Sequence, residues 1–195
     1  MLEGVSEKWY SVRKATVEDI PSVIRINLES LPENYWYGFY VQMLENWGEA
    51  FLVADAGGQI IGYAMSRVEE SRDPVLLGLT TEIGEEKSVG QKIAELLKSI
   101  LQEARPVGHL VSIAVAPGYR GKGVGASLLS ETIRVLRDHY RVESVYLEVR
   151  VSNTPAIRLY EKFGFKKSRI IRKYYRDGED AYVYVKRLAG LPQNS

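Results

Sequence analysis

The sequence predicts a mixed α/β domain whose central β-sheet combines parallel and antiparallel strands. An apolar, β-branched run at 110–115 leads through a glycine-rich turn into an amphipathic helix, and a second apolar run follows at 144–151. This strand–helix–strand order is a crossover, which pairs its two strands in parallel. Two further pairs of apolar runs, at 49–68 and 165–186, surround short turns and predict antiparallel hairpins. The sheet is therefore expected to be mixed.

Length and composition favour one compact domain at 9–188 between flexible tails at 1–8 and 189–195. The 195 residues are 45% hydrophobic, enough for a full core. The net charge is only +1, so no overall field favours direct binding to nucleic acid or to an anionic membrane. No apolar run approaches the roughly 18 residues that cross a bilayer, and the first residues lack a signal-peptide pattern. The absence of cysteine excludes thiolate nucleophiles and suits a reducing cytoplasm.

The turn after the central strand has the composition of an anion site. It runs through Arg120-Gly121-Lys122-Gly123-Val124-Gly125 and ends in a helix. The first N–H groups of a helix and its dipole attract anions, and glycine lets an anion approach the backbone closely. The spacing fits neither the P-loop nor the dinucleotide fingerprint. The turn is therefore predicted to hold a pyrophosphate; the alternative is that its glycines only shape a tight turn and cap a helix.

Other elements follow from local signals. Residues 9–14 alternate enough for a first strand, and Thr16 with the acidic residues after it predicts the start of a helix. The apolar spacing at 85–103 predicts a helix that Pro106 ends. Asn153 or Thr154 is expected to cap a short helix that Gly164 terminates. The last hairpin is expected to pair 165–175 with 180–186.

The segment 31–47 is unusually aromatic. It follows a Pro-Glu-Asn turn and places five aromatic side chains within six positions: Tyr35, Trp36, Tyr37, Phe39 and Tyr40. Such a cluster is commonly part of a core. On a helix, however, these five cannot all face one way, so some are expected to line a groove or to lie exposed.

Three blocks in this order resemble the GNAT superfamily of N-acetyltransferases. They are the R-x-x-G-x-G pattern of Arg120, Gly123 and Gly125 behind a strand ending in Ala-Val, the run EVRVSN at 148–153, and AIRLYEKFGF at 156–165. LPENY at 31–35 resembles the substrate loop of the branch that acetylates protein N-termini, such as the NatA-type catalytic subunit and its archaeal relatives. The matches extend from about Val12 to Val185. The resemblance implies a twisted, mostly antiparallel sheet of about seven strands with helices on both faces.

The resemblance also implies acetyl-CoA as co-substrate and no required metal. A backbone N–H near Val115 would polarise the thioester oxygen. Asn153 would bind the pantetheine arm, although its simpler role is a helix cap. The residues implied to bind acetyl-CoA are Ile113, Ala114, Val115, Arg120, Gly121, Lys122, Gly123, Val124, Gly125, Ala126, Asn153 and Tyr160.

The same matches suggest catalytic residues. Glu148 lies mid-strand between apolar neighbours, where a carboxylate is costly unless it is paired or functional. His109 precedes the central strand and, taken alone, reads as an ordinary strand-edge residue. The family implies that Glu148 and His109 act as base or proton relay and that Tyr160 is the general acid or thiol anchor; core packing is the alternative for Tyr160. Glu148 and His109 could hold an adventitious divalent metal ion, but two ligands do not make a metal site.

The implied substrate-binding residues are Glu33, Tyr35 and Tyr175, with Tyr174 beside the last of these. Glu33 would meet the cationic amine of a peptide end, and the tyrosines would pack on its first side chains. For the tyrosines of the final hairpin, simple strand packing remains the alternative.

Together these features predict a cytoplasmic protein N-terminal α-amino acetyltransferase. Without cysteine, acetyl transfer would occur by direct attack in a ternary complex. The expected partners are protein N-termini, with an auxiliary or ribosomal partner left open. Acetylation of a small amine or a lysine is one alternative, and a non-catalytic acyl-CoA-binding subunit is another. The chain also departs from those relatives by a longer segment at 71–105, which could cover the substrate groove, bind a partner or decorate the fold.

Overall fold

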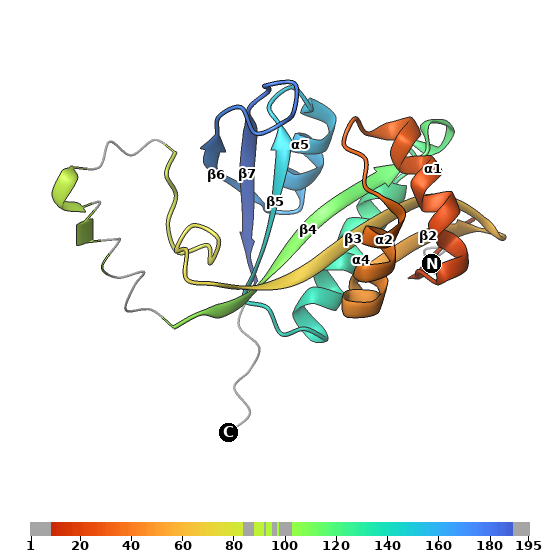
Figure 1. The fold of residues 1–195 in the computed structure, drawn as a ribbon, viewed down its shortest axis with the longest axis horizontal. Coiled ribbons are helices and arrows are strands. Elements are labelled where there is room, and N and C mark those ends of the chain that lie inside the picture. The colour runs from red at the N-terminus through yellow and green to blue at the C-terminus, as the bar shows by residue number, and fades with distance from the viewer. Residues whose placement is uncertain (1–8, 84–87, 92, 95–96, 98–102, 189–195) are drawn as a thin grey trace, which may run out of the picture. The chain divides into compact units, whose positions relative to one another are not determined.

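Strands and helices follow one another as the sequence predicts. The computed structural model describes residues 9–83, 88–91, 93–94, 97 and 103–188, and Figure 1 shows their arrangement. Among these residues no helix is both long and apolar enough to cross a bilayer. The strands are β1 (Ser11–Lys14), β2 (Phe51–Ala56), β3 (Gln59–Ser71), β4 (Arg105–Val115), β5 (Ser144–Arg150), β6 (Lys166–Ile171) and β7 (Ala181–Arg187). The helices are α1 (Ile20–Ser30), α2 (Tyr37–Trp47), α4 (Val124–Asp138) and α5 (Thr154–Lys162).

The seven strands form one mixed sheet in the order β1-β2-β3-β4-β5-β7-β6. β4 and β5 pair in parallel, with His109 opposite Tyr146. β1 pairs with β2, β2 with β3, β5 with β7 and β6 with β7, all antiparallel. The predicted crossover is confirmed, as are the mixed character of the sheet and its number of strands.

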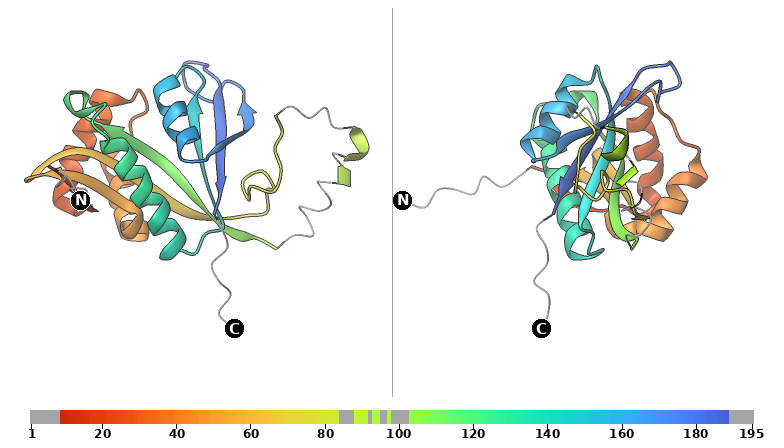
Figure 2. Two further views of the ribbon diagram at one scale, coloured as in Figure 1. Left: turned by 180° about the vertical axis from the view of Figure 1, so that it is seen from behind. Right: turned by 90° about the vertical axis from the view of Figure 1, so that its left-hand side faces the viewer.

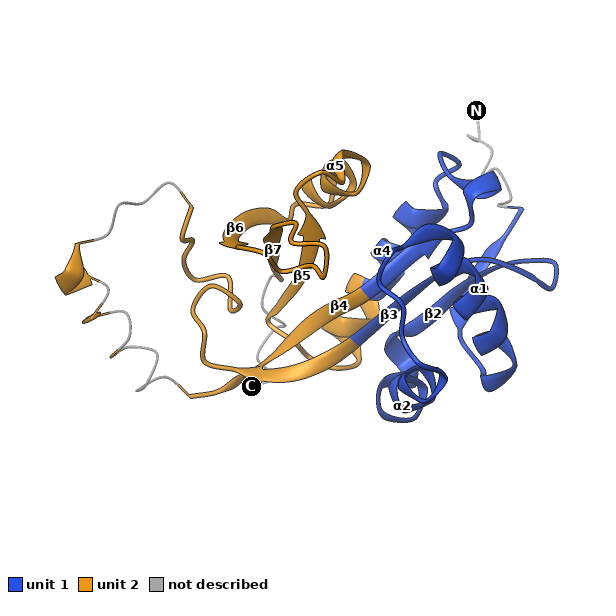
Figure 3. Cartoon of the chain, turned by 45° about the horizontal axis from the view of Figure 1, so that its top comes forward, with its two compact units in different colours: residues 1–66, 112–132 blue, residues 67–111, 133–195 orange. Residues whose placement is uncertain are grey.

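The chain divides into two compact units, coloured separately in Figure 3. Unit 1 comprises residues 1–66 and 112–132, and unit 2 comprises residues 67–111 and 133–195. β3, β4 and α4 each contribute residues to both. The predicted tails at 1–8 and 189–195 lie outside the described residues.

Unit 1 has helices on both faces of its strands. On one face the Asn27 side chain of α1 donates to the Tyr63 hydroxyl, which also bonds Ser112. On the other face Gly62 leaves room for α4: a Cβ at this position would lie 3.2 Å from Leu128 and 3.3 Å from Val124. Figures 1 and 2 show α1 and α4 on opposite faces of these strands.

Unit 2 covers each face of its β5–β7 pair differently. One face presents Tyr146 and Val183, which pack in a buried cluster with Val75 and Leu77 from the segment after β3. The opposite face presents Tyr184, whose ring lies 6.5 Å from that of Tyr160 on α5. Figure 1 shows α5 beside β5 and β7. The beginning of the 71–105 segment is therefore part of the core.

The same segment also covers the edge of the sheet. The Glu82 N–H donates to the Ser168 carbonyl of the edge strand β6 at 2.7 Å. Arg169 of β6 forms ion pairs with Asp73 and Glu82, both at 2.7 Å. Covering an edge strand satisfies its backbone groups and blocks pairing with another chain.

Only part of the predicted 85–103 helix can be compared with the structure. Residues 89–91, 93–94 and 97 are helical, Ser88 and Glu103 are not, and residues 85–87, 92, 95–96 and 98–102 lie outside the described residues. Val89, Ile93 and Leu97 are exposed. Pro106 does follow the helical stretch, as the second residue of β4.

The final hairpin is shorter than the sequence pattern suggests. β6 ends at Ile171 rather than at Tyr175. Lys173 has a φ of 52°, a left-handed conformation that interrupts a strand. The Asp180 carboxylate accepts from the Lys173 N–H and from Arg172, which stabilises this bend. Tyr174 and Tyr175 therefore lie in the connecting turn and not in a strand.

The ion pairs of Arg169 give a test of how the segment is anchored. Replacing Arg169 by Ala is expected to lower the free energy of unfolding by about 1 kcal/mol, because these half-exposed pairs are partly screened by water. Arg172→Ala removes a single, more exposed pair and is expected to cost less than about 0.5 kcal/mol in a urea titration. Equal losses in the two variants would contradict the anchoring role.

Candidate active site

The glycine-rich turn of unit 1 forms an open surface of backbone. Gly121 and Gly123 have φ angles of 74° and 83°, a conformation that other residues adopt with strain. At both positions a Cβ atom would meet nothing within 4 Å, so a ligand has room to approach the main chain. Ser127 N–H donates to the Gly123 carbonyl, and the helical N–H groups before it have no acceptor within α4. The turn therefore fits an anionic ligand such as a pyrophosphate.

The carbonyl of Val115 joins three parts of unit 1. It accepts a hydrogen bond from Arg120 Nε at 3.0 Å and one from the Ser30 hydroxyl at 3.4 Å. The end of α1 and the glycine-rich turn thus meet at the last residue of β4. Because LPENY begins at Leu31, the aromatic segment starts beside the predicted thioester position.

Lys122, the second basic residue of the turn, lies beside two aromatic rings. Lys122 Nζ lies 5.5 Å from the centre of the Tyr119 ring and 6.0 Å from that of Trp9. These two rings stack on each other with centres 5.9 Å apart. Cation–π attraction therefore holds the Lys122 ammonium beside the turn.

The side chains of the aromatic segment divide into buried and exposed ones, as their spacing on a helix requires. Tyr40 is fully buried, while Trp36 is 72% and Tyr37 54% exposed. Tyr35 stacks on Phe39 with ring centres 4.7 Å apart. Glu33 and Tyr35 are both half-buried, so each still reaches solvent from the α1–α2 connection. The prediction that some aromatics are exposed is confirmed.

Unit 2 brings the predicted catalytic pair together. His109 Nε2 lies 2.8 Å from Glu148 Oε2. The ring also faces a second carboxylate, because His109 Nδ1 lies 3.3 Å from Glu69 Oε1. Tyr146 stacks on the imidazole with ring centres 4.3 Å apart and planes 11° from parallel. The three charged residues come from β3, β4 and β5, which are neighbours in the sheet.

The ionisation of this cluster follows from its contacts. Burial lowers the pKa of His109, but hydrogen bonds and charge from Glu148 and Glu69 outweigh it and raise the pKa above its usual value. The hydrogen bond with His109 is the largest influence lowering the pKa of Glu69, to about 2. Burial and the Glu69 carboxylate raise the pKa of Tyr146, whose hydroxyl donates to Glu69 Oε2 at 2.7 Å. Glu69 is therefore ionised at neutral pH.

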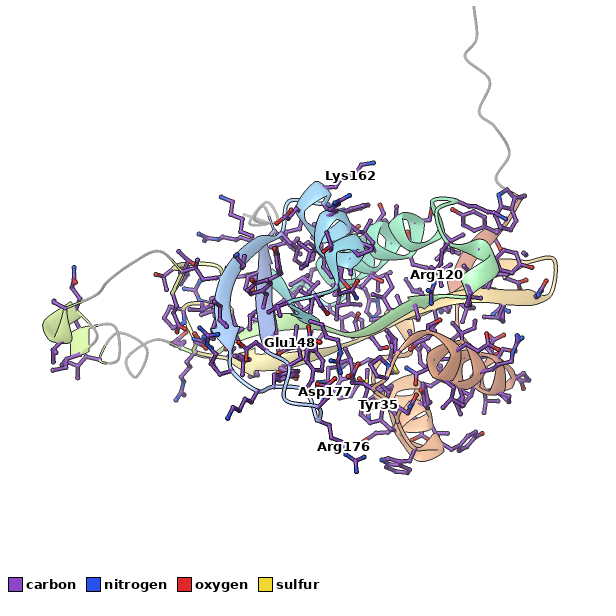
Figure 4. The ribbon with its side chains drawn as sticks, turned by 90° about the horizontal axis from the view of Figure 1, so that it is seen from above. Tyr35, Arg120, Glu148, Lys162, Arg176 and Asp177 are labelled. Carbon is purple, nitrogen blue, oxygen red and sulfur yellow. The ribbon has the colours of Figure 1, made fainter. Side chains whose placement is uncertain are left out.

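Arg150, two residues after Glu148 on β5, organises the turn that carries Tyr175. Its guanidinium lies 4.0 Å from the centre of the Tyr175 ring and donates to Asp177 and Glu179, both at 2.7 Å. The Tyr175 N–H in turn donates to the Glu179 carbonyl. Figure 4 labels Glu148, Asp177 and the exposed Arg176 of this region. Tyr175 is thus held by a network and not by strand pairing.

The two residues predicted on and before α5 have clear structural roles. Asn153 Oδ1 accepts from the Ala156 N–H at 3.2 Å and caps the helix, which confirms the cap. Tyr160 is buried against Phe165, and burial alone raises the pKa of its hydroxyl. Neither role excludes a contact with a ligand.

Sequence reasoning missed Glu69 and Arg150. Arg150 had a usable signal, because Tyr146, Glu148 and Arg150 alternate with apolar residues and must share one face of β5. Glu69 had none: it lies 40 residues before His109 and its proximity depends on the sheet. Within the described part of the chain, no group of three or more histidine or acidic residues is arranged to hold a metal ion.

The sequence and the fold match a known class of enzymes. The family model described as the acetyltransferase (GNAT) family matches residues 20–165, so the chain belongs to this family. It is 44% identical over 174 residues to the N-alpha-acetyltransferase of Sulfolobus acidocaldarius, covering 89% of this chain and 90% of that relative. It is also similar to the crystal structure of Ard1 from Thermoplasma volcanium, with a TM-score of 0.70, 26% identity, and coverage of 92% and 98%. A chain of the NatB acetyltransferase complex bound to CoA and MES gives a TM-score of 0.64, 25% identity, and coverage of 92% and 99%.

Arg150 provides a test of how the Tyr175 turn is held. We expect Arg150→Ala to speed hydrogen exchange of the Tyr175 and Gly178 amides roughly tenfold, because charge-assisted hydrogen bonds contribute roughly 1.5–3 kcal/mol. Arg176→Ala is the matched control, since this arginine is exposed on the same turn, and its exchange is expected to equal that of the native chain. Unchanged exchange in Arg150→Ala would show that the turn does not depend on Arg150.

Proposed function

We propose that this chain transfers an acetyl group from acetyl-CoA to the free N-terminal α-amine of proteins. The observation that carries the proposal is the His109–Glu148 pair, a base with a proton partner 2.8 Å away on neighbouring strands. Support comes from the relative named N-alpha-acetyltransferase, which is similar to this chain over nearly its whole length. An acyl-CoA-binding subunit without catalysis would not need a partly buried carboxylate–imidazole pair.

We assign acetyl-CoA to the glycine-rich turn. The open backbone at Gly121 and Gly123 and the free end of α4 suit its pyrophosphate, and Arg120 and Lys122 add positive charge. Residues 113–115 would lie along its acyl end, with Val124, Gly125 and Ala126 at the helix start. Acetyl-CoA supplies an activated acyl thioester. The chain's part is to fix the phosphates and to direct a backbone N–H near Val115 at the thioester oxygen.

Glu148 and His109 would remove the proton from the attacking amine. A peptide α-ammonium group has a pKa of roughly 7.7–8.0, so a carboxylate acting with a neighbouring neutral imidazole is a sufficient base. Glu148 accepts the proton, directly or through one water, and His109 at 2.8 Å shares it. The freed electron pair on nitrogen then attacks the acyl carbon directly, since the chain has no cysteine to form an acyl-enzyme. The C–S bond breaks, CoA leaves as the thiolate, and the new amide nitrogen releases its remaining extra proton to solvent.

Tyr160 would stabilise the departing sulfur. A simple thiol has a pKa of about 8.5, whereas burial raises that of Tyr160 above the ordinary phenol value. Full proton transfer from Tyr160 to the thiolate is therefore unfavourable. The hydroxyl instead donates a hydrogen bond to the thiolate, and Asn153 holds the pantetheine arm nearby.

The substrate's first residues would be bound by Glu33, Tyr35 and Tyr175. Glu33 offers a carboxylate to the ammonium group, and the two tyrosines offer rings and hydroxyl groups for the leading side chains. In this proposal residues 9–188 act as a single cytoplasmic acetyltransferase domain, without direct nucleic-acid or membrane binding. Protein N-termini are its partners, and an auxiliary or ribosomal partner remains compatible with it.

Peptide turnover tests the proposed substrate class. The panel contains peptides with free Ser, Ala, Met-Leu and Met-Glu N-termini, and one blocked peptide with an internal lysine. We expect acetylation of free N-termini, because the predicted groove offers a carboxylate and tyrosines for a peptide end, and no product from the blocked peptide. Mass spectrometry of the products locates the acetyl group. Acetylation of the lysine alone would replace the proposal by a side-chain acetyltransferase, and cofactor binding without any product would end it.

A further inference from the structure

The imidazole of His109 lies between two carboxylates. Its Nε2 is 2.8 Å from Glu148 and its Nδ1 is 3.3 Å from Glu69. An ionised carboxylate can only accept hydrogen bonds, so a neutral ring satisfies one of these partners and an imidazolium satisfies both. The tautomer of the neutral ring therefore depends on which carboxylate other hydrogen bonds hold more firmly in place as an acceptor.

Glu69 is a carboxylate that two further donors hold in place. Its Oε2 accepts from the Tyr146 hydroxyl, and its Oε1 accepts from Arg67 Nε on the same strand. The Tyr146 ring also stacks on His109, so one residue orients both the acid and the imidazole. With a pKa of about 2, Glu69 does not take up a proton at neutral pH. It serves as a constant negative charge.

We propose that Glu69 is a positioning residue for proton transfer, which holds neutral His109 as the Nδ1–H tautomer and so presents Nε2 to Glu148 as the proton acceptor. This inference rests on the proposed function and assigns a further residue to the same site. Removing the amine proton breaks an N–H bond of the substrate ammonium and leaves its electron pair on nitrogen. The proton passes to the Glu148 carboxylate and on to His109 Nε2, where a new N–H bond forms.

The charges around His109 give this role a pH dependence. Glu148 and Tyr146 face the ring from β5, and Glu69 faces it from β3. Arg67 donates to Glu69 and so affects the ring indirectly. The two carboxylates favour the imidazolium, so His109 becomes neutral, and able to accept a proton, only above its ordinary titration range. Removing the Glu69 charge lowers the pH above which His109 is neutral, but it also makes Nε2 a weaker base.

Nitrogen NMR of the imidazole rings tests the inference without relying on turnover. The chain has two histidines, so His139→Gln assigns the signals of His109. In the native protein we expect the neutral His109 ring to carry its proton on Nδ1. In Glu69→Gln its titration midpoint should fall by about one to three pH units, and the tautomer preference should be lost. Glu70→Gln is the matched control, because Glu70 is the next residue along β3 and is exposed.

Steady-state kinetics with a free N-terminal peptide give the second readout. In the pH profile of kcat, Glu69→Gln is expected to move the acid limb to lower pH. It is also expected to reduce kcat on the alkaline plateau about tenfold, which is part of the roughly 10²–10⁴-fold acceleration that general acid–base catalysis supplies. Acetyl-CoA binding should be unchanged. A lower plateau with an unmoved limb would indicate a merely structural role and overturn the inference.

The outcomes separate this inference from the function on which it rests. A native His109 that is protonated on Nε2 when neutral would overturn the role of Glu69, whether or not Glu69→Gln folds. A midpoint that is the same in Glu69→Gln and Glu70→Gln would do so as well. The expected titration in a protein that acetylates no amine would instead overturn the proposed function.

Discussion

The placement of the His109 imidazole between two carboxylates is the interaction around which the central strands of this structure are arranged. Burying a charged ring is costly unless acidic partners lie on both sides, and Glu69 and Glu148 provide them from the strands flanking β4. The parallel register that sets His109 opposite Tyr146 fixes this geometry. Three adjacent strands thus bring together Glu69, His109 and Glu148, which are separated in sequence by 40 and 39 residues.

The polar face of β5 shows how one strand serves several purposes. Tyr146, Glu148 and Arg150 alternate with apolar residues, so they share one face of β5, where Tyr146 also packs in the buried cluster of Val75 and Leu77. Tyr146 orients Glu69 and the imidazole, Glu148 meets the imidazole, and Arg150 holds the turn of Tyr175. Their backbone is stabilised by full antiparallel pairing with β7. A rigid strand of this kind can place functional groups more accurately than a loop.

Local patterns predicted most elements, and contacts between distant segments account for what they missed. The glycine-rich turn, the crossover helix and the Asn153 cap were predictable because each depends on residues a few positions apart. Glu69 was not, since its partners come from other strands. The end of β6 was not, because an Asp180 carboxylate stabilises the left-handed Lys173. The beginning of the 71–105 segment is core because Val75 and Leu77 meet β5 and β7, which composition could not show.

The central claim is that Glu148, with His109, performs proton transfer and takes no part in holding acetyl-CoA. Its most direct test compares Glu148→Gln with the native chain in both turnover and equilibrium acetyl-CoA binding. The account predicts a fall in kcat of about a hundredfold or more with an unchanged dissociation constant for acetyl-CoA. Native turnover in the variant, or equal losses of binding and turnover, would contradict it.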